Sequence, residues 1–396
     1  MREAIVIGAG PAGSTAARCL ARRGVEVTLV DAGRLPRDKV CGECLSALGL
    51  ATLGAVGLGD VLREARPIEL VAASVYPTRG RPLTLPLPRP MAGITRWTMD
   101  RLLLDSAVSA GVTVLEKSRA TRVEPGDRPT VHVRGPDGER TLTADAVFLA
   151  DGKGTLPGAA TTPTPRPTGD LGVKAHFRGV ELPADQIALF GVRGHYGGIA
   201  PVSDIGNPPA PTATRRVAAG DVLWNLAFAV PADRVARHAG SFDSLLDVMK
   251  GENARLAHAL RDATVAGGWL ASPLPRFAPR PAEGWPPGVI PIGNAAAALE
   301  PVGGEGMGLA IASAAMAVEH VLAGGSTDAL QAKYVRLWRR RRLACRAIAQ
   351  LVSRPAVAVP AIALARCLPA VGAAGAWLAG KRSNGIGFAD GRPAVS

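Results

Sequence analysis

Three segments near the N-terminus carry the clearest pattern of apolar and polar positions. Residues 3–7 form a short apolar run, and residues 25–30 form a second one rich in β-branched side chains, so both predict buried strands. Between them, residues 11–23 are rich in alanine and end at Gly24, which predicts a helix with a glycine stop. The order of strand, helix and strand is typical of the opening of a parallel α/β sheet.

Further segments extend this pattern toward the C-terminus. Buried strands and helical spacing alternate again, and a glycine-rich turn over residues 293–308 leads into a long alanine-rich helix that ends near residue 323. The additional predicted elements are a helix at 99–110, a strand at 112–115, hairpin strands at 130–134 and 140–143, and strands at 145–150 and 288–292.

The middle of the chain has a different pattern of apolar and polar positions. Residues 171–230 alternate as strands around a loop at 204–214, a Thr/Pro-rich linker is predicted at 159–168, and a polar helical stretch covers 241–263. We therefore predict an α/β fold: a Rossmann-like domain, an inserted antiparallel-sheet domain and a helical C-terminal part. The expected boundaries are 1–75, 95–160 and 285–325 for the first, 76–94 and 161–284 for the second, and 326–396 for the third.

Composition excludes several classes of protein. The chain has 396 residues, of which 47% are hydrophobic and 20% charged, so it is neither disordered nor collagen-like. The formal charge is +13, and 39 of the 46 basic residues are Arg, which raises nucleic acid, anionic membranes and anionic small ligands as partners. Aromatic residues make up only 4%, so base stacking is disfavoured and we expect no nucleic-acid partner. Five unevenly spaced Cys favour a reducing, cytoplasmic compartment.

Neither end of the chain shows a membrane-crossing pattern. No signal-peptide pattern precedes the first strand. The most apolar segment, residues 356–380, is interrupted by Pro360, Arg366 and Pro369, so no run reaches the ~20 apolar residues of a spanning helix.

The strongest local motif lies between the first strand and the first helix. Gly8, Gly10 and Gly13 form a G-x-G-x-x-G fingerprint: the first permits a tight turn, the second a close approach of backbone to pyrophosphate, and the third close helix–strand packing. Asp31 ends the second strand, where its carboxylate can bind an adenosine ribose. This context predicts dinucleotide binding, but it does not distinguish NAD from FAD.

Three further segments narrow the choice. Arg96 precedes a predicted helix with Asp100 as its N-cap, Asp151–Gly152 follows the strand at 145–150, and the segment 293–308 follows the strand at 288–292. Together with the fingerprint, these segments resemble the glutathione-reductase-like flavoproteins, and more narrowly the geranylgeranyl-reductase-like and aromatic-hydroxylase-like FAD oxidoreductases. The resemblance covers residues 1–323.

The resemblance implies an FAD-dependent oxidoreductase and a set of cofactor-binding residues. The implied set is Gly8, Gly10, Pro11, Ala12, Gly13, Asp31, Cys41, Gly42, Arg96, Asp151, Gly152, Asn294, Pro301, Gly303, Gly304, Gly306 and Met307. Glycines 303, 304, 306 and 308 are expected to leave room for the flavin ring and the substrate. Asn294 stands where the family usually has Asp, and it still offers an acceptor to a ribityl hydroxyl.

The segment from Lys39 to Ser46 resembles the loop that reductases of this group place next to the flavin. Cys41 and Cys44 within it leave three interpretations: two half-buried thiols in a turn, a thiol relay to the flavin, or a zinc site. The first is favoured, because no second Cys pair and no nearby His accompany them, and we expect no metal. Since no second nucleotide fingerprint follows, NAD(P)H would act as a transient electron donor.

The reaction is left between two alternatives. His195, Tyr196, Trp224 and Phe228 are candidate contacts for a hydrophobic substrate, although half-buried aromatic residues at strand spacing are usually core. The pair Gly197–Gly198 gives fewer aromatic residues than isoprenoid reductases of the group tend to have. It therefore favours a monooxygenase of a hydrophobic aromatic, polyketide-like or lipid substrate over an isoprenoid reductase. No catalytic residue is predicted.

The C-terminal part bears on the partner. Residues 333–342 are basic with interleaved apolar positions, and residues 343–380 are rich in Ala, Leu and Val. This pattern is typical either of helices packed on the substrate domain or of a peripheral contact with an anionic membrane through 333–380. A third hypothesis, from another class, is a basic membrane- or nucleic-acid-binding protein with a relic nucleotide fold.

Overall fold

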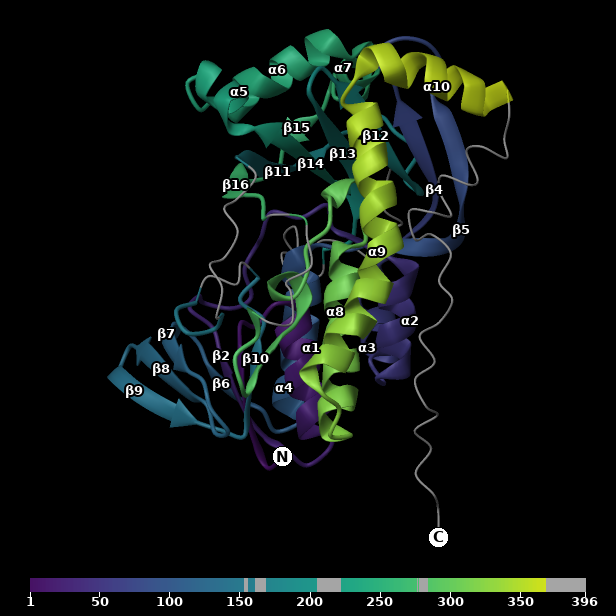
Figure 1. Cartoon of the computed structure of the whole chain (residues 1–396). Helices are drawn as coiled ribbons and strands as arrows, with labels where there is room; N and C mark the ends of the chain where they lie inside the picture. Colours follow the sequence, from purple (N-terminus) through teal and green to yellow (C-terminus); the bar gives the residue numbers. More distant parts are fainter. Residues whose placement is uncertain (153–155, 161–168, 205–221, 276, 278–283, 368–396) are drawn as a thin grey trace.

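A five-stranded parallel sheet forms the centre of the N-terminal domain. The computed structural model describes all residues except 153–155, 161–168, 205–221, 276, 278–283 and 368–396 (Figure 1). The strand order is β17 (Val289–Pro291), β10 (Ala146–Leu149), β1 (Glu3–Ile7), β2 (Glu26–Val30) and β6 (Thr113–Leu115), with all neighbours parallel. Short apolar runs become strands here because both faces of the sheet are covered.

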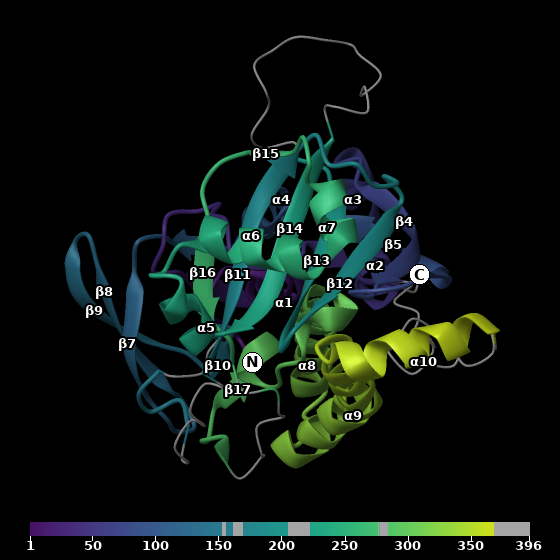
Figure 2. The ribbon, with the colours of Figure 1, turned by 90° about the horizontal axis from the view of Figure 1, so that it is seen from above.

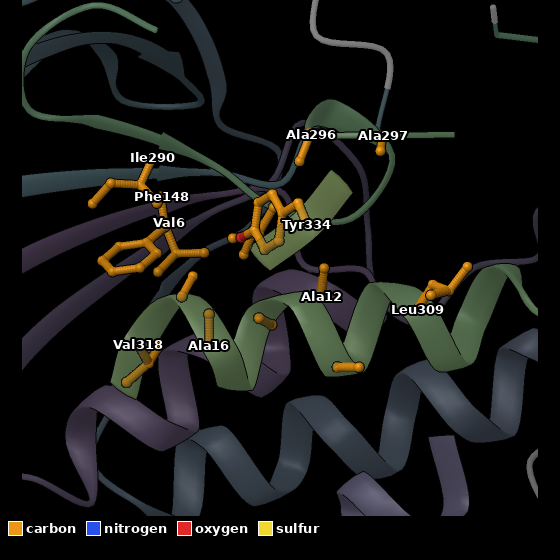
Figure 3. Packing of buried hydrophobic residues seen from close by; sticks show 14 of the residues in the cluster. Val6, Ala12, Ala16, Phe148, Ile290, Ala296, Ala297, Leu309, Val318 and Tyr334 are labelled. Atoms are coloured by element: carbon orange, nitrogen blue, oxygen red, sulfur yellow. The ribbon is translucent and has the colours of Figure 1, made fainter. Parts of the chain in front are cut away.

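Helices cover one face of this sheet and a small sheet covers the other. Figure 3 shows Val6 and Phe148 directed toward the helical layer of α1 (Pro11–Ala21) and α8 (Gly306–Leu322), where they join Ala16 and Val318. Helix α4 (Arg96–Ser109) packs beside α1. The alternate strand positions, including Ile5 and Val147, face β7 (Arg119–Glu124), β8 (Thr130–Gly135) and β9 (Gly138–Thr143).

The second domain is a nine-stranded sheet that is largely antiparallel. Its order is β15 (Thr264–Val265), β11 (Asp170–Arg178), β14 (Leu223–Pro231), β13 (His195–Val202), β12 (Gln186–Val192), β4 (Ile68–Tyr76), β5 (Leu83–Gly93) and β3 (Cys44–Leu45), with β16 (Leu270–Pro273) beside β11. Helices α5 (Ala232–Arg237), α6 (Phe242–Glu252) and α7 (Ala254–Ala259) lie over its outer face (Figure 2). The inner face is directed toward the first domain.

The boundary between the domains differs from the expected one. Strand β4 begins at Ile68 and β3 lies at Cys44–Leu45, so the large sheet takes strands from inside the range 1–75 that we assigned to the first domain. Strands β3, β4 and β5 are not among the predicted elements. Residues 161–168 of the linker predicted at 159–168 and most of the loop predicted at 204–214 lie outside the described residues.

The remaining helices complete the packing. Helices α2 (Ala47–Ala55) and α3 (Gly59–Glu64) pack beside α8 and α4. Helix α9 (Thr327–Val352) is not a peripheral addition, because Tyr334 and Trp338 are buried in the main core. Helix α10 (Pro355–Cys367) follows it at a bend of 111°, and among the described residues no single helix meets the length and hydropathy of a membrane span.

Candidate flavin site

The glycine turn at the end of β1 is shaped by backbone contacts. Gly8 has φ +103°, and its N–H donates to the carbonyl oxygen of Val30 at 2.8 Å. A Cβ at Gly8 would lie 2.5 Å from the Ala150 carbonyl oxygen, and one at Gly13 would overlap the carbonyl oxygen of Gly8. These two positions therefore require glycine for the fold itself, as the strand–helix turn demands.

Gly10 is glycine for a different reason. The atoms nearest to a Cβ placed there would be Arg96 Nη2 at 3.8 Å and Lys39 Nζ at 3.9 Å, so the space above Gly10 is bordered by two cations. Gly10 is also the N-cap of α1, with Pro11 following, and it brings no side chain to cap the first-turn N–H groups. Free N–H groups, a positive helix end and two cations form a site that fits a pyrophosphate.

This environment lowers the pKa of Lys39. Burial, together with the charges of Arg96 and Arg37, lowers the pKa of Lys39 to about 8. Burial alone would also lower the pKa of Arg96, but Asp100, which accepts from Arg96 Nη2 at 2.6 Å and Nε at 2.8 Å, raises it overall. We had expected Asp100 to be the N-cap of α4, and this expectation is wrong. Thr95 caps the helix, and Asp100 lies one turn inside it.

Asp31 is fixed at the carboxyl end of β2. Its Oδ2 accepts from the Ala9 N–H at 2.8 Å, and its Oδ1 accepts from the Gly33 N–H at 2.8 Å. The carboxylate is 3% exposed and pairs with Arg37 Nη1 at 3.0 Å. The geometry suits a ribose acceptor beside the phosphate site, and sequence reasoning missed Arg37 as its partner.

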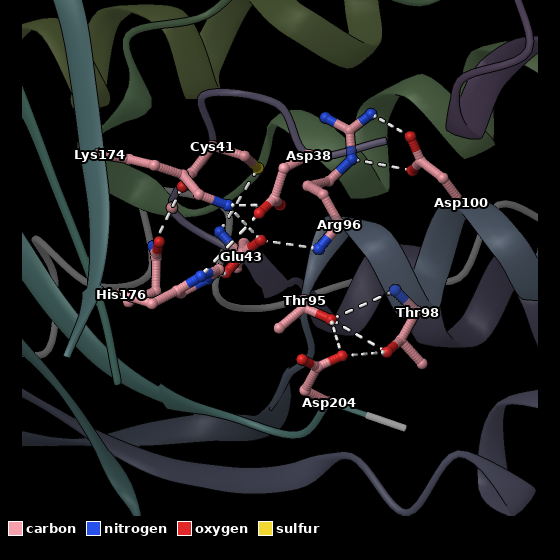
Figure 4. Close-up of polar contacts among 12 residues, drawn as sticks. Asp38, Cys41, Glu43, Thr95, Arg96, Thr98, Asp100, Lys174, His176 and Asp204 are labelled. Atoms are coloured by element: carbon pink, nitrogen blue, oxygen red, sulfur yellow. Dashed lines mark hydrogen bonds and ion pairs between the residues drawn. The ribbon is translucent and has the colours of Figure 1, made fainter. Parts of the chain in front are cut away.

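A buried network of charges lies in the loop after Lys39 (Figure 4). Glu43 is fully buried and has φ +54°, which is rare for a residue with a side chain. Its Oε1 accepts from Lys174 Nζ at 2.6 Å and from the Arg96 N–H at 2.7 Å. Its Oε2 lies 2.6 Å from His176 Nε2. Glu43 thus ties the loop both to β11 and to the first turn of α4.

Glu43 is held as a carboxylate by these contacts. Burial alone would raise its pKa, but the hydrogen bond from His176 and the charge of Lys174 lower it below its ordinary value. Asp38 adds a second acceptor for Lys174 at 3.0 Å and is 37% exposed, so the network extends from the interior toward solvent. We define the Glu43 network as Glu43, Lys174, His176 and Asp38.

The two cysteines lie beside this network. The Glu43 N–H donates to Cys41 Sγ at 3.4 Å, and Cys44 Sγ donates to the Gly42 carbonyl oxygen at 3.3 Å. Cys41 also contacts the Arg96 guanidinium. Asn225 Nδ2 donates to the carbonyl oxygen of Cys41 at 3.0 Å, which joins the loop to β14.

The glycines of the segment 293–308 serve two purposes. Cβ atoms at Gly303, Gly304 and Gly308 would press against Cys345, Met91 and Ser46, respectively, so these residues are glycine for protein packing. The Cβ directions at these three positions point to protein atoms and do not by themselves support the expected room for the flavin ring. Gly306 has open space within 4 Å, as do Gly42 and Gly152, which follows Asp151 at the end of β10.

The other residues expected in this segment are placed as follows. Asn294 is exposed inside an otherwise buried run, so its side chain faces open space. Pro301 begins a short 3-10 turn (Pro301–Gly303). The side chain of Met307 packs in an apolar cluster with Leu45, so only its backbone can face a cofactor.

The four candidate substrate contacts do not all lie on the same face of the large sheet. Trp224 and Phe228 lie in the outer cluster with the α5–α7 layer, and both are buried. His195 and Ile199 are four positions apart in β13, so their side chains lie on the same, outer face of the sheet. Burial, together with the charge of Arg234, lowers the pKa of His195 to about 4. These three residues therefore face the outer layer, away from the Glu43 network on the inner face.

Tyr196 is the remaining candidate, and it lies on the inner face. Its hydroxyl donates to Glu300 Oε1 at 3.3 Å, which joins the substrate sheet to the segment 293–308. Burial, followed by Glu300, raises the pKa of Tyr196 well above its ordinary value, and burial raises the pKa of Glu300. Both shifts arise mainly from burial beside the segment expected to hold the flavin.

Sequence reasoning missed the polar residues of β11. Val173, Ala175 and Phe177 face the outer cluster, while Lys174 and His176 alternate with them and face the loop. That alternation of apolar and polar residues was the available signal, because it predicts a strand with one polar face.

The shifted lysine gives a prediction about pH. Lys39 must be protonated to pair with a pyrophosphate, so the affinity of the apo-protein for FAD should fall as pH rises above about 8, by up to about 10-fold per pH unit. Lys39→Met should bind FAD about 10-fold more weakly at neutral pH and lose this dependence. Flavin fluorescence titrations from about pH 6 to 10 measure both effects. Lys117→Met, at an exposed position, is the control. If the FAD affinity of Lys39→Met depends on pH as that of the wild type does, Lys39 does not pair with the pyrophosphate.

The glycine turn, the anion site at the start of α1 and the buried Asp31 define a dinucleotide-binding protein of the Rossmann type. A family model for an FAD binding domain matches residues 1–185. This match covers just under half of the chain, marks residues 1–185 as an FAD-binding domain and gives FAD as the cofactor. The residues present fit that cofactor, as the open space at Gly10 and the cations bordering it show.

Two curated relatives and one solved structure show the extent of the similarity. A menaquinone reductase of Mycolicibacterium smegmatis is 35% identical over 106 residues, which cover 27% of this chain and 25% of the relative. A digeranylgeranylglycerophospholipid reductase of Methanopyrus kandleri is 31% identical over 153 residues, 38% of this chain and 37% of the relative. The matched segments therefore span well under half of these relatives. A flavin-dependent brominase shares the fold with a TM-score of 0.74 at 19% identity, covering 96% of this chain and 93% of its own.

Proposed function

We propose that the protein is an FAD-dependent reductase that saturates carbon–carbon double bonds in a lipid with a polyprenyl chain. The two relatives described above are named for reduction of menaquinone and of a digeranylgeranyl phospholipid. A geranylgeranyl chain and the tail of menaquinone both contain prenyl double bonds, which are the reducible groups that the two lipids share. The observation that carries the proposal in this chain is the Glu43 network beside the cofactor site.

Saturating a double bond requires a hydride at one carbon and a proton at the other. Bound FAD supplies the hydride chemistry in its reduced form. The chain must supply the proton, and histidine is the side chain that gains and loses one near neutral pH. His176 Nε2 is 2.6 Å from the buried Glu43 carboxylate, and Asp38 connects His176 toward solvent. The network can therefore hold a proton and replace it after each turnover.

One of the two glycines in the sequence argument against a reductase has another explanation. The pair Gly197–Gly198 had favoured hydroxylation because it leaves few aromatic residues in that strand. A Cβ at Gly197 would meet Phe228 and Met249 in the outer core, so this glycine reflects packing against α6 and not the shape of a substrate site. Hydroxylation with NAD(P)H as the electron donor remains the second candidate and is tested in the same assay.

The deciding experiment measures the mass of the product. Purified holoprotein is incubated without oxygen with dithionite and geranylgeraniol, and in parallel in air with NAD(P)H. We expect products that gain two hydrogens per double bond in the anaerobic arm. His176→Asn should lower the turnover about 100-fold while FAD is retained. Gain of an oxygen atom in the aerobic arm, with none of the reduced product, would replace reduction by hydroxylation.

A further inference from the structure

Helix α9 presents two opposite stripes. One stripe is buried in the core and consists of Leu330, Tyr334, Trp338, Cys345, Ala349 and Val352. The opposite stripe is exposed and carries Arg336, Arg339, Arg340 and Arg346, with Leu343 among them at 59% exposure. Because the core already fixes the helix through its buried stripe, the exposed arginines are not needed for folding.

The charged residues of α9 and α10 are nearly all of one sign. From Ala329 to Cys367 the chain has nine Lys or Arg and no Asp or Glu, although it has 33 acidic residues in all. Surface helices usually intersperse both signs, which neutralises them locally. An uninterrupted positive field over two consecutive helices is complementary to an anionic surface.

Helix α10 adds exposed apolar side chains to the same region. It buries Ala358, Ile362 and Ala365 and exposes Val357 at 49% and Leu364 at 55%. With Leu343, these are three of the seven large hydrophobic residues exposed in the described part of the chain. Figure 1 shows α10 lying across the end of α9, at the edge of the molecule. Basic and apolar side chains therefore lie together on adjoining helices.

We propose that this basic–apolar surface, formed by the exposed side chains of α9 and α10, docks the protein onto an anionic lipid bilayer. Arginines attract anionic headgroups, at about 1 kcal/mol for each residue near the membrane surface, and the apolar side chains enter the interface. Nucleic acid is disfavoured because Tyr334 and Trp338, the aromatic residues of α9, face the core and offer no ring for base stacking. Residues 368–380, which the sequence placed in the same contact, lie outside the described residues.

The test must use variants that keep the fold. Removing residues 343–396 would delete Cys345, Ala349 and Val352 from the core, so loss of binding would be ambiguous. Arg339→Glu/Arg340→Glu changes only exposed positions. Its control is Arg119→Glu/Arg140→Glu, which makes the same change in net charge at exposed positions in the β7–β9 sheet, away from α10 in Figure 1. Retained FAD in both variants shows that they are folded.

Co-sedimentation of the full chain is measured with phosphatidylcholine vesicles, with and without phosphatidylglycerol, at low and high salt. We expect binding to the anionic vesicles only, a loss on the order of 100-fold in Arg339→Glu/Arg340→Glu, and little change in the control. Leu364→Asp should weaken the binding that remains at high salt. Equal loss in both charge variants, absence of vesicle binding, or binding to RNA in its place would overturn the proposal. None of these readouts depends on the reaction catalysed.

Discussion

Gly10→Val is expected to give a folded protein that no longer holds FAD. A Cβ at Gly10 meets nothing closer than 3.8 Å, and the nearest atoms are the ends of the flexible Arg96 and Lys39 side chains, so the backbone is not disturbed. The branched side chain would occupy the space where two cations and the start of α1 converge. We expect the affinity for FAD to fall by at least about 100-fold, with an unfolding transition close to that of the apo wild type.

Gly13→Val is the matched comparison. A Cβ at Gly13 would overlap the carbonyl oxygen of Gly8, which belongs to the backbone and cannot move aside, so this variant should not fold. Absorbance of the purified proteins measures bound flavin, and far-UV circular dichroism measures the fold. Normal flavin retention by Gly10→Val would show that the pyrophosphate does not lie above Gly10.

The Rossmann-like part of the fold was predictable because its signals are local. Strands β1, β10 and β17 of the parallel sheet are short apolar runs covered on both faces, and the glycine turn follows β1 directly. The helix α8 and the hairpin β8–β9 were predicted for the same reason. Strands β3, β4 and β5 were not. β4 and β5 pair with each other, but the prolines of β5 disfavour a strand, and the pairings of β3 with β5 and of β4 with β12 join residues far apart in the sequence.

The orientation of the large sheet could not be predicted. In β13 and β14 every residue is buried or half-buried, since helices cover the outer face and the first domain covers the inner one. Apolar and polar residues then no longer alternate, and the strand pattern does not say which face a side chain joins. Trp224 and Tyr196 therefore looked equivalent in the sequence, although they face opposite sides of the sheet.

The Glu43 network escaped prediction for a related reason. Glu43 and Lys174 are separated by 131 positions, and only the pairing of the loop with β11 brings them together. Removing Glu43 should have a large effect, because Lys174 is 1% exposed and would lose its closest acceptor. We expect Glu43→Gln to lower the free energy of unfolding by about 3 kcal/mol, since Asp38 still accepts from Lys174.

Comparing variants that lack Glu43 alone with variants that also lack Lys174 distinguishes the loss of this ion pair from unspecific destabilisation of the fold. In Glu43→Gln/Lys174→Met the buried ammonium is absent as well, so much of the stability should return relative to Glu43→Gln. Asp60→Asn, which removes an exposed ion pair with Arg63, should change the free energy of unfolding by less than about 1 kcal/mol. Urea unfolding of the apo-proteins measures all three, and a double variant no more stable than Glu43→Gln would contradict the pairing.

The pH dependence gives an independent check on the same carboxylate. The pKa of Glu43 is lowered in the folded protein, so its contribution to stability is fully present above its unfolded pKa of about 4.5 and is lost as pH falls through the folded value. Glu43→Gln has no such group, so the stability difference between wild type and variant should shrink as pH falls below about 4.5. Because Glu43 also accepts from the Arg96 N–H, the variant should bind FAD about 10-fold more weakly at neutral pH. FAD affinity unchanged in a destabilised variant would mean that the network supports the fold without positioning Arg96.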